Sequence, residues 1–188
     1  MLSEKFQVES FGRHSIRLKE YDYAQPGWYF VTICTHKMIQ SLGNVKNGKV
    51  VLTNAGKIAD EEWKKTKSVR SNVDLDNYVI MPNHIHGIII IDHSVGAIRR
   101  IAPNNTEANQ RFAPTLKPNS LGSIIGQFKS IVTKRVRKTG IPDFRWQRNY
   151  YERIIRNEKE LYQIRKYLQL NPLKWEIEKE TPENLEFI

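Results

Sequence analysis

The chain has 188 residues, of which 39% are hydrophobic and 10% aromatic, enough to bury the core of one globular domain. No apolar run is long enough to span a membrane, and the first residues lack the apolar core of a signal peptide. The single cysteine, Cys34, excludes an internal disulfide framework and a cysteine-based zinc site. We therefore expect a cytoplasmic protein.

The charge is strongly positive, with a net charge of +10 and a pI of about 9.7. The excess is concentrated between Ser120 and Leu170, a stretch that contains twelve Lys and Arg residues but only four Asp and Glu residues. Trp and Tyr residues are interleaved with these basic residues, as on surfaces that contact both bases and backbone. A solvated helix face is the simpler explanation of such a charge run. The aromatic interleaving favours a polyanionic partner such as nucleic acid.

The predicted elements follow an irregular stretch, residues 1–26, which we expect to be an N-terminal extension. The first half of the chain predicts a strand at Trp28–Thr35, a turn at Lys46–Lys49, a short strand at Val50–Leu52 and a helix capped by Thr53 or Asn54. Two further strands are expected at Val73–Met81 and His84–Ile91. The second half predicts an amphipathic helix capped by Ser120, a strand at Trp146–Ile155, and a helix capped by Asn157 that stops before Pro172. Residues 93–119 lack periodicity and are predicted to be a flexible insertion in a domain covering residues 27–175. Residues 176–188 form an acidic tail.

This β-α-β-β-α-β order predicts an α+β, ferredoxin-like fold. Its four-stranded antiparallel sheet would carry two helices on one face, with a further C-terminal helix. Many unrelated functions use this fold, so the fold alone does not identify the activity.

Two histidines, His84 and His86, begin the most hydrophobic predicted strand. Side chains alternate along a strand, so both imidazoles point to the same side and could bind one divalent cation. A His-x-His pair alone is equally consistent with two half-buried structural histidines. A reacting group elsewhere in the chain would favour the metal site.

Four tyrosines are candidates for that reacting group. Tyr150 and Tyr151 lie on a predicted strand, where packing can explain one or both, and Tyr162 and Tyr167 lie on the last predicted helix. Tyr167 is at the edge of that helix's apolar stripe, and Asn171 follows four residues later on the same face. The simpler alternative is that Tyr167 is an ordinary amphipathic edge residue and Asn171 a cap before Pro172.

These motifs together resemble those of a known family. The segment Tyr78–His86 is similar to the histidine-hydrophobic-histidine motif of HUH single-tyrosine transposases, the IS200-like group. The segment Tyr167–Pro172, YLQLNP, resembles the tyrosine-helix motif of their REP-associated branch, and Ser15–Thr35 resembles that branch's N-terminal segment. The resemblance covers most of the chain between Ser15 and Trp175. It departs from the insertion-sequence transposases at Asn171, where those proteins have glutamine.

The resemblance implies a specific chemistry. His84, His86 and the side-chain amide of Asn171 would bind Mg²⁺ or Mn²⁺ beside a phosphodiester, and the metal would act as a Lewis acid. Tyr167 would be the nucleophile and would form a 5′-phosphotyrosine, leaving a free 3′-hydroxyl. Because the covalent link conserves the energy of the broken bond, the same enzyme could rejoin the strand without ATP.

The partner implied by the resemblance is single-stranded DNA next to a short hairpin, in a bacterial nucleoid. The residues predicted to contact this DNA are Lys129, Lys134, Arg135, Arg137, Lys138, Trp146, Arg148 and Tyr151. The short connection before the tyrosine helix favours a monomer that builds its own site, with a dimer as the alternative. Two other functions remain open: a non-catalytic single-stranded nucleic-acid-binding module of the same fold, and a metal-dependent hydrolase that forms no covalent intermediate.

Overall fold

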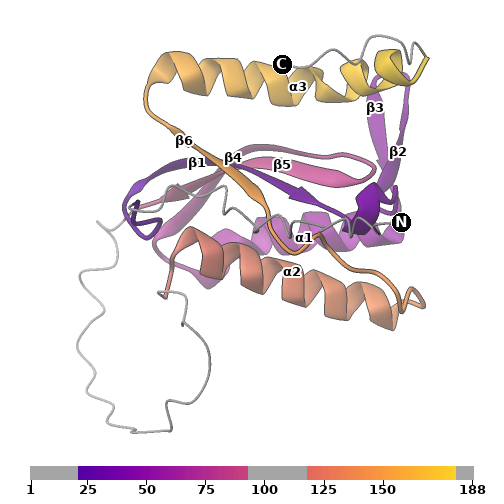
Figure 1. The fold of residues 1–188 in the computed structure, drawn as a ribbon, viewed down its shortest axis with the longest axis horizontal. Coiled ribbons are helices and arrows are strands. Elements are labelled where there is room, and N and C mark those ends of the chain that lie inside the picture. Colours follow the sequence, from indigo (N-terminus) through magenta and orange to yellow (C-terminus); the bar gives the residue numbers. More distant parts are fainter. Residues whose placement is uncertain (1–20, 93–117, 181–188) are drawn as a thin grey trace, which may run out of the picture.

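A four-stranded antiparallel sheet with strand order β4-β5-β1-β6 forms the centre of the computed structural model (Figure 1). The structure describes residues 21–92 and 118–180, with side chains as far as residue 178. The elements are β1 (Gly27–Cys34), a 3-10 turn η1 (His36–Met38), β2 (Gly43–Lys46), β3 (Lys49–Leu52), α1 (Asn54–Val69), β4 (Val73–Ile80), β5 (His84–Ile91), α2 (Leu121–Lys138), β6 (Tyr151–Ile155) and α3 (Glu158–Glu180). The predicted α+β class and antiparallel sheet are confirmed.

The helices α1 and α2 cover one face of this sheet (Figure 1). Alternate residues of β1 and β5, such as Val31, Ile33, Ile85 and Ile89, are at most 1% exposed and pack under these helices in the main core. Both helices begin as predicted. The Thr53 hydroxyl accepts the Gly56 N–H, and the Ser120 hydroxyl accepts the Ser123 N–H, so each cap satisfies an N–H that has no partner within the helix.

The helix α3 lies on the opposite face of the sheet (Figure 1). Its stripe of Leu161, Ile164 and Leu168 packs against Ile88 of β5 and Ile155 of β6 in a second core. The side chain of Asn157 accepts the Glu160 N–H at 2.9 Å, as expected for the cap of this helix. The sheet is therefore covered on both faces, and the face that carries His84 and His86 lies under α3.

The prediction that the last helix stops before Pro172 is wrong, because α3 continues through Pro172 to Glu180. A proline inside a helix removes one backbone hydrogen bond and crowds the preceding turn. Here Pro172 is buried, and the helix beyond it is held by tertiary contacts. The carboxylate of Glu176 accepts the backbone N–H groups of Asn47 at 2.9 Å and Gly48 at 2.6 Å, in the turn between β2 and β3. Residues 176–180, which we expected in the acidic tail, are thus the end of α3.

Two strand predictions also need correction. The turn at Asn47 and Gly48 joins two paired strands, β2 and β3. The sequence predicted only β3, as a short strand at Val50–Leu52, and missed β2. The predicted strand from Trp146 is shorter than expected, since β6 begins at Tyr151 and Trp146 makes only an isolated bridge with Thr35.

Parts of the expected domain plan lie outside the described residues, namely positions 1–20, 93–117 and 181–188. Within the expected N-terminal extension, Tyr21 and Tyr23 pack against the main core, and the Tyr23 carbonyl accepts the first N–H of α2 at 3.0 Å. Among the helices of the described residues, none is long and apolar enough to cross a membrane.

Candidate active site

The central strand β5 presents its first histidines to α3. His84 lies opposite Cys34 and His86 opposite Thr32 in the antiparallel pairing with β1. The two imidazole rings have centroids 4.4 Å apart, and both side chains are less than 10% exposed. The alternation of the strand therefore places the two rings side by side, as the His-x-His spacing predicted.

The orientation of His84 is set by a hydrogen bond to the preceding residue. Nδ1 of His84 lies 2.7 Å from Oδ1 of Asn83, and the Asn83 amide nitrogen donates to the Met38 carbonyl at 3.2 Å. Because the Asn83 oxygen must accept, Nδ1 of His84 carries the proton. Nε2 of His84 then has a free lone pair, which is the form in which a histidine binds a metal.

His86 is held on both of its nitrogens. Nδ1 lies 2.8 Å from the Thr32 hydroxyl, and Nε2 lies 3.1 Å from the hydroxyl of Tyr167. Phe30 stacks on the imidazole at a centroid distance of 5.4 Å. A phenol is a good donor at neutral pH, so the consistent arrangement has Tyr167 donating to Nε2 and Nδ1 donating to Thr32.

Tyr167 extends from α3 over the histidine face of the sheet. Its ring meets Phe30 and His86 edge to face, and the residue is 38% exposed. Burial raises the pKa of this phenol, a side-chain hydrogen bond from Asn171 lowers it, and the charge of Glu178 raises it, with a net upward shift. Tyr167 is therefore neutral at physiological pH and requires added positive charge nearby to react as a phenolate.

Asn171 completes the cluster one turn further along α3. It is 8% exposed and lies close enough to Tyr167 to lower the pKa of the phenol. The structure thus brings together the four residues for which the sequence predicted catalysis and metal binding: Tyr167, His84, His86 and Asn171.

The donor set fits a divalent cation by its chemistry. Burial lowers the pKa of His84 to about 4, and burial together with the nearby His84 lowers the pKa of His86 to about 3. Both rings are neutral at pH 7 and able to ligate. Within residues 21–92 and 118–178, no group of three or more His, Cys, Asp or Glu side chains is placed to hold a metal ion. The Asn171 amide, on α3 beside the two histidines, is the candidate for a third ligand. A metal and the Tyr167 hydroxyl would compete for Nε2 of His86.

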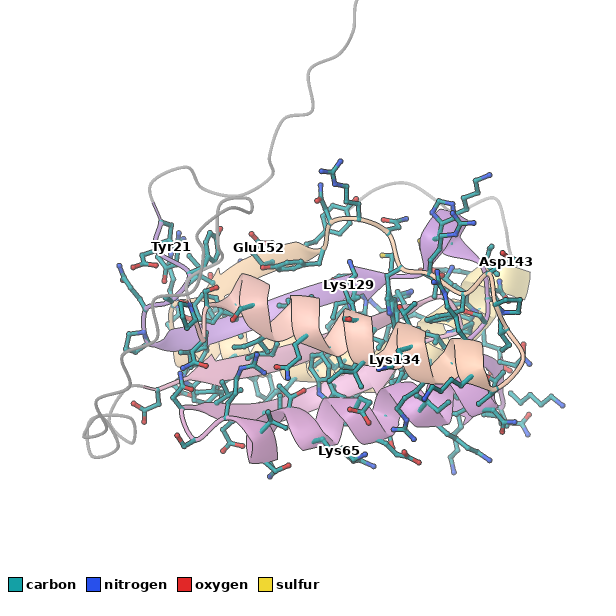
Figure 2. The ribbon with its side chains drawn as sticks, turned by 90° about the horizontal axis from the view of Figure 1, so that it is seen from below. Tyr21, Lys65, Lys129, Lys134, Asp143 and Glu152 are labelled. Atoms are coloured by element: carbon teal, nitrogen blue, oxygen red, sulfur yellow. The ribbon has the colours of Figure 1, made fainter. Side chains whose placement is uncertain are left out.

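The basic residues predicted to contact DNA lie mostly on the far side of the sheet. Figure 2 views this side and shows Lys129 and Lys134 on α2. A groove of about 610 Å³ lies between α2 and the segment before β6. It is lined by Lys129, Ser130, Thr133, Lys134, Arg137, Trp146, Gln147 and Arg148.

Several of these residues already have structural partners. Lys129 donates to the carbonyls of residues 147–149, and burial lowers its pKa to about 8. Arg135 pairs with Glu61 and Glu62 of α1. Arg137 donates to the Phe144 carbonyl through Nε. The exposed cations of the predicted set are Lys134, Arg137, Lys138 and Arg148.

The two predicted aromatic contacts differ in position. Trp146 is 7% exposed and packs against Phe128 and Phe144, so its ring belongs to the core and is not available to stack on a base. Tyr151 is 56% exposed and pairs with Thr32 across the sheet. Because paired residues point to the same face, Tyr151 lies on the histidine side, at the edge strand β6.

The sequence analysis missed four residues that border this cluster. Thr32 and Asn83 hold the histidines, and their roles follow from strand register and from a tight turn, which single-sequence patterns do not resolve. The ring of Trp175 lies 5.8 Å from that of His84, and Nζ of Lys174 lies 5.9 Å from the Tyr167 ring centre. The last two were missed because the helix was expected to end before Pro172.

Comparison with known proteins gives one relative and several structural neighbours. An uncharacterised protein of Haemophilus influenzae is 38% identical over 175 residues, which is 93% of this chain and 96% of the relative. A solved structure of a REP-associated tyrosine transposase bound to a REP hairpin superposes with a TM-score of 0.55 at 18% identity, covering 87% of this chain and 74% of the other. A Deinococcus radiodurans structure matches with a TM-score of only 0.41 at 12% identity. No protein-family model matches the chain.

Proposed function

We propose that this chain, which belongs to one family with the Haemophilus influenzae protein and has the fold of a REP-associated tyrosine transposase, is a metal-dependent enzyme that cuts and rejoins single-stranded DNA. The observation that carries the proposal is the contact of 3.1 Å between the Tyr167 hydroxyl and Nε2 of His86, with His84 and Asn171 beside it. A phenol, two neutral imidazoles and an amide on one buried face suit phosphoryl transfer through a covalent tyrosine intermediate.

The reaction begins with attack of the Tyr167 oxygen on a DNA phosphorus atom. A bond forms between that oxygen and phosphorus, and the bond from phosphorus to the 3′-oxygen breaks. The phenol proton is given up and the leaving 3′-oxygen gains one, so the products are a 5′-phosphotyrosine and a 3′-hydroxyl. Without metal, His86 accepts the Tyr167 hydrogen bond, whereas Asn171 lowers the pKa of the same phenol and so favours its negative form.

His84, His86 and Asn171 would hold Mg²⁺ or Mn²⁺, which, when bound, supplies Lewis-acid stabilisation of the charge that develops on the phosphate. Thr32 and Asn83 each hydrogen-bond the Nδ1 atom of one histidine, which leaves Nε2 as the metal-binding nitrogen of each ring. On His86 a bound metal would replace the hydrogen bond from Tyr167. Imidazoles bind borderline metals better than hard Mg²⁺, so we expect Mn²⁺ to support the reaction better.

The DNA substrate would meet two surfaces of the molecule. The scissile strand lies on the histidine face, where Tyr151 is exposed at the edge of the sheet. The groove beside α2, with the exposed Lys134 and Arg148, suits the backbone of a hairpin stem because it presents several cations to phosphates. The REP hairpin bound by the structural neighbour supports a hairpin as the substrate of this chain.

A single chain would build its own site. The connection from β6 to α3 consists of residues 156 and 157, and α3 returns over its own sheet. Arg165 on α3 forms hydrogen bonds to both carboxylate oxygens of Asp76 on β4, and Glu176 holds the distal end of the helix on the β2–β3 turn. These contacts fix Tyr167 over His86 of the same chain, which favours a monomer.

Trapping of a covalent DNA adduct tests the proposed function. Purified protein with Mn²⁺ is incubated with a pool of single-stranded hairpin oligonucleotides whose flanks are randomised, and adducts are detected by denaturing electrophoresis and peptide mapping. We expect the adduct on Tyr167 and none in Tyr167→Phe, which removes one oxygen and keeps the ring. Tyr162→Phe, which alters an exposed tyrosine of the same helix, serves as the matched control and should form the adduct normally.

The other outcomes identify the alternative functions. Oligonucleotide binding without cleavage would indicate a non-catalytic single-stranded nucleic-acid-binding module. Cleavage without an adduct would indicate a hydrolase that uses water as the nucleophile. Either result would overturn the proposed reaction.

A further inference from the structure

The last turns of α3 are fixed beside the candidate site. The Glu176 carboxylate holds the backbone of Asn47 and Gly48, and the Leu173 side chain lies over Gly48, where a Cβ atom would meet it at 3.5 Å. The conformation of this turn, with φ of +52° at Asn47 and +66° at Gly48, points both N–H groups to one carboxylate. The helix beyond Pro172 is therefore held in a defined position on the β2–β3 hairpin.

This position places Trp175 next to the histidines. Trp175 follows Asn171 by four residues and Tyr167 by eight, so the three side chains share one side of the helix. The indole and the His84 imidazole have centroids 5.8 Å apart and planes inclined by 51°. The indole thus borders the site on the side of His84, away from the contact between His86 and Tyr167.

Trp175 differs from the other tryptophans in its surroundings. Trp63 and Trp146 are 1% and 7% exposed and belong to the main core. Trp28 and Trp175 are both partly exposed, but Trp28 packs against the second core and lies under the guanidinium of Arg165, 5.9 Å from the ring centre. Trp175 is the one tryptophan that combines partial exposure with contact to a candidate metal ligand.

We propose that Trp175 is a stacking platform for the base of the nucleotide next to the phosphate that Tyr167 attacks. The inference rests on the proposed function, because it takes single-stranded DNA as the ligand. A partly exposed indole offers a nucleobase a large flat partner, and such stacking tolerates any base. Lys174, whose Nζ lies 5.9 Å from the Tyr167 ring centre, adds a cation beside the same phosphate.

Tryptophan fluorescence tests the stacking directly. The probe is an oligothymidylate of about 12 nucleotides, a length within the site sizes of single-strand-binding proteins. Its binding is followed independently by the anisotropy of a terminal dye, in the Tyr167→Phe background to prevent cleavage. We expect DNA to quench the indole emission, Trp175→Phe to abolish most of the quenching, and the matched control Trp28→Phe to retain it.

A second experiment separates stacking from mere support of His84. Abasic sites are introduced one at a time around the cleaved phosphate of a hairpin oligonucleotide that forms the adduct. In the wild type, one abasic position next to the phosphate should weaken binding by about 5- to 150-fold, the usual range for loss of one stacked base. In Trp175→Ala the same position should have no further effect, while Trp175→Phe restores part of the sensitivity. A residue that only supported His84 would lower Mn²⁺ affinity without this coupling to one base.

The possible results decide between the two proposals. Binding without quenching, or quenching that persists in Trp175→Phe and disappears in Trp28→Phe, would overturn the role of Trp175 and leave the proposed function standing. An abasic site that weakened binding equally in the wild type and in Trp175→Ala would likewise overturn the role of Trp175 and leave the proposed function standing. If the wild type bound neither the oligothymidylate nor the hairpin oligonucleotide and formed no adduct, both the proposed function and the role of Trp175 would be overturned.

Discussion

Gly87 follows His86 on β5 and packs against Trp63 of α1, on the face of the sheet opposite the candidate site, and its replacement by alanine should disturb both stability and chemistry. A Cβ atom at this position would lie 2.9 Å from Cη2 and 3.1 Å from Cε2 of Trp63, and closer still to Cζ2. Ordinary contact begins near 3.4 Å, so β5 and Trp63 must separate by more than half an ångström. Trp63 is 1% exposed and belongs to the main core, so a shift of its ring disturbs the residues packed around it.

The expected loss of stability is about 1–3 kcal/mol, the range for overpacking a core. The smaller chain entropy of the unfolded alanine variant offsets about 0.4–1 kcal/mol of this. The domain should remain folded, because small domains are stable by about 5–15 kcal/mol. Separation of β5 from Trp63 also displaces His86, the next residue along the strand. A shift of about 1 Å in a catalytic group can slow a reaction by about 10²-fold, so the rate of adduct formation should fall by a factor of about ten or more.

Urea unfolding and single-turnover adduct formation measure the two effects separately. Gly126→Ala on α2 is the matched control, because a Cβ atom there meets nothing within 4 Å. This control should gain about 0.5–1 kcal/mol from the better helix propensity of alanine and keep normal activity. Adding Trp63→Phe to Gly87→Ala should recover part of the lost stability, since the smaller ring relieves the contact. A Gly87→Ala protein as stable and as active as the wild type would refute the packing of β5 on Trp63.

Three further predictions address the histidine anchors, the assembly of the site and its pH dependence. Thr32→Val removes the hydroxyl that contacts Nδ1 of His86 and should reduce Mn²⁺ affinity by about 10- to 100-fold in titration calorimetry. Thr32→Ser keeps a hydroxyl and should bind Mn²⁺ normally. Equal Mn²⁺ affinity of the wild type and both variants would argue against this anchor. A mixture of Tyr167→Phe and His84→Ala chains should not regain DNA cleavage, because each chain builds its own site, and restored cleavage would mean that subunits share their sites. Burial and the hydrogen bond to Asp60 raise the pKa of Tyr78 to about 12 from 10.0. The neutral Tyr78 phenol therefore contributes fully to the free energy of unfolding below pH 10, and this contribution is lost as the pH rises through 12. Tyr78→Phe should therefore flatten the fall of unfolding free energy over this alkaline range in urea titrations, and an unchanged slope would contradict the assignment.

The sequence by itself predicted the elements whose signals are local. The alternation on β5 placed His84 and His86 on one face, because side chains on any strand alternate. The caps at Thr53, Ser120 and Asn157 were identifiable because a cap depends only on the few residues that follow it. The four-residue spacing of Tyr167 and Asn171 likewise determined that both share one side of a helix.

Tertiary structure decided the features that depend on contacts between distant segments. The sequence could not show that Thr32 pairs with His86, because strand register comes from packing across the sheet. Charge and aromaticity predicted Arg135 and Trp146 as DNA contacts, but the sequence could not show that Arg135 pairs with Glu61 and Glu62 of α1 and that Trp146 packs in the core. The rule that proline ends a helix was overridden at Pro172, because the helix beyond it is bound to the β2–β3 turn through Glu176. That continuation brings Lys174 and Trp175 to the candidate site, where local propensity alone would have ended the helix.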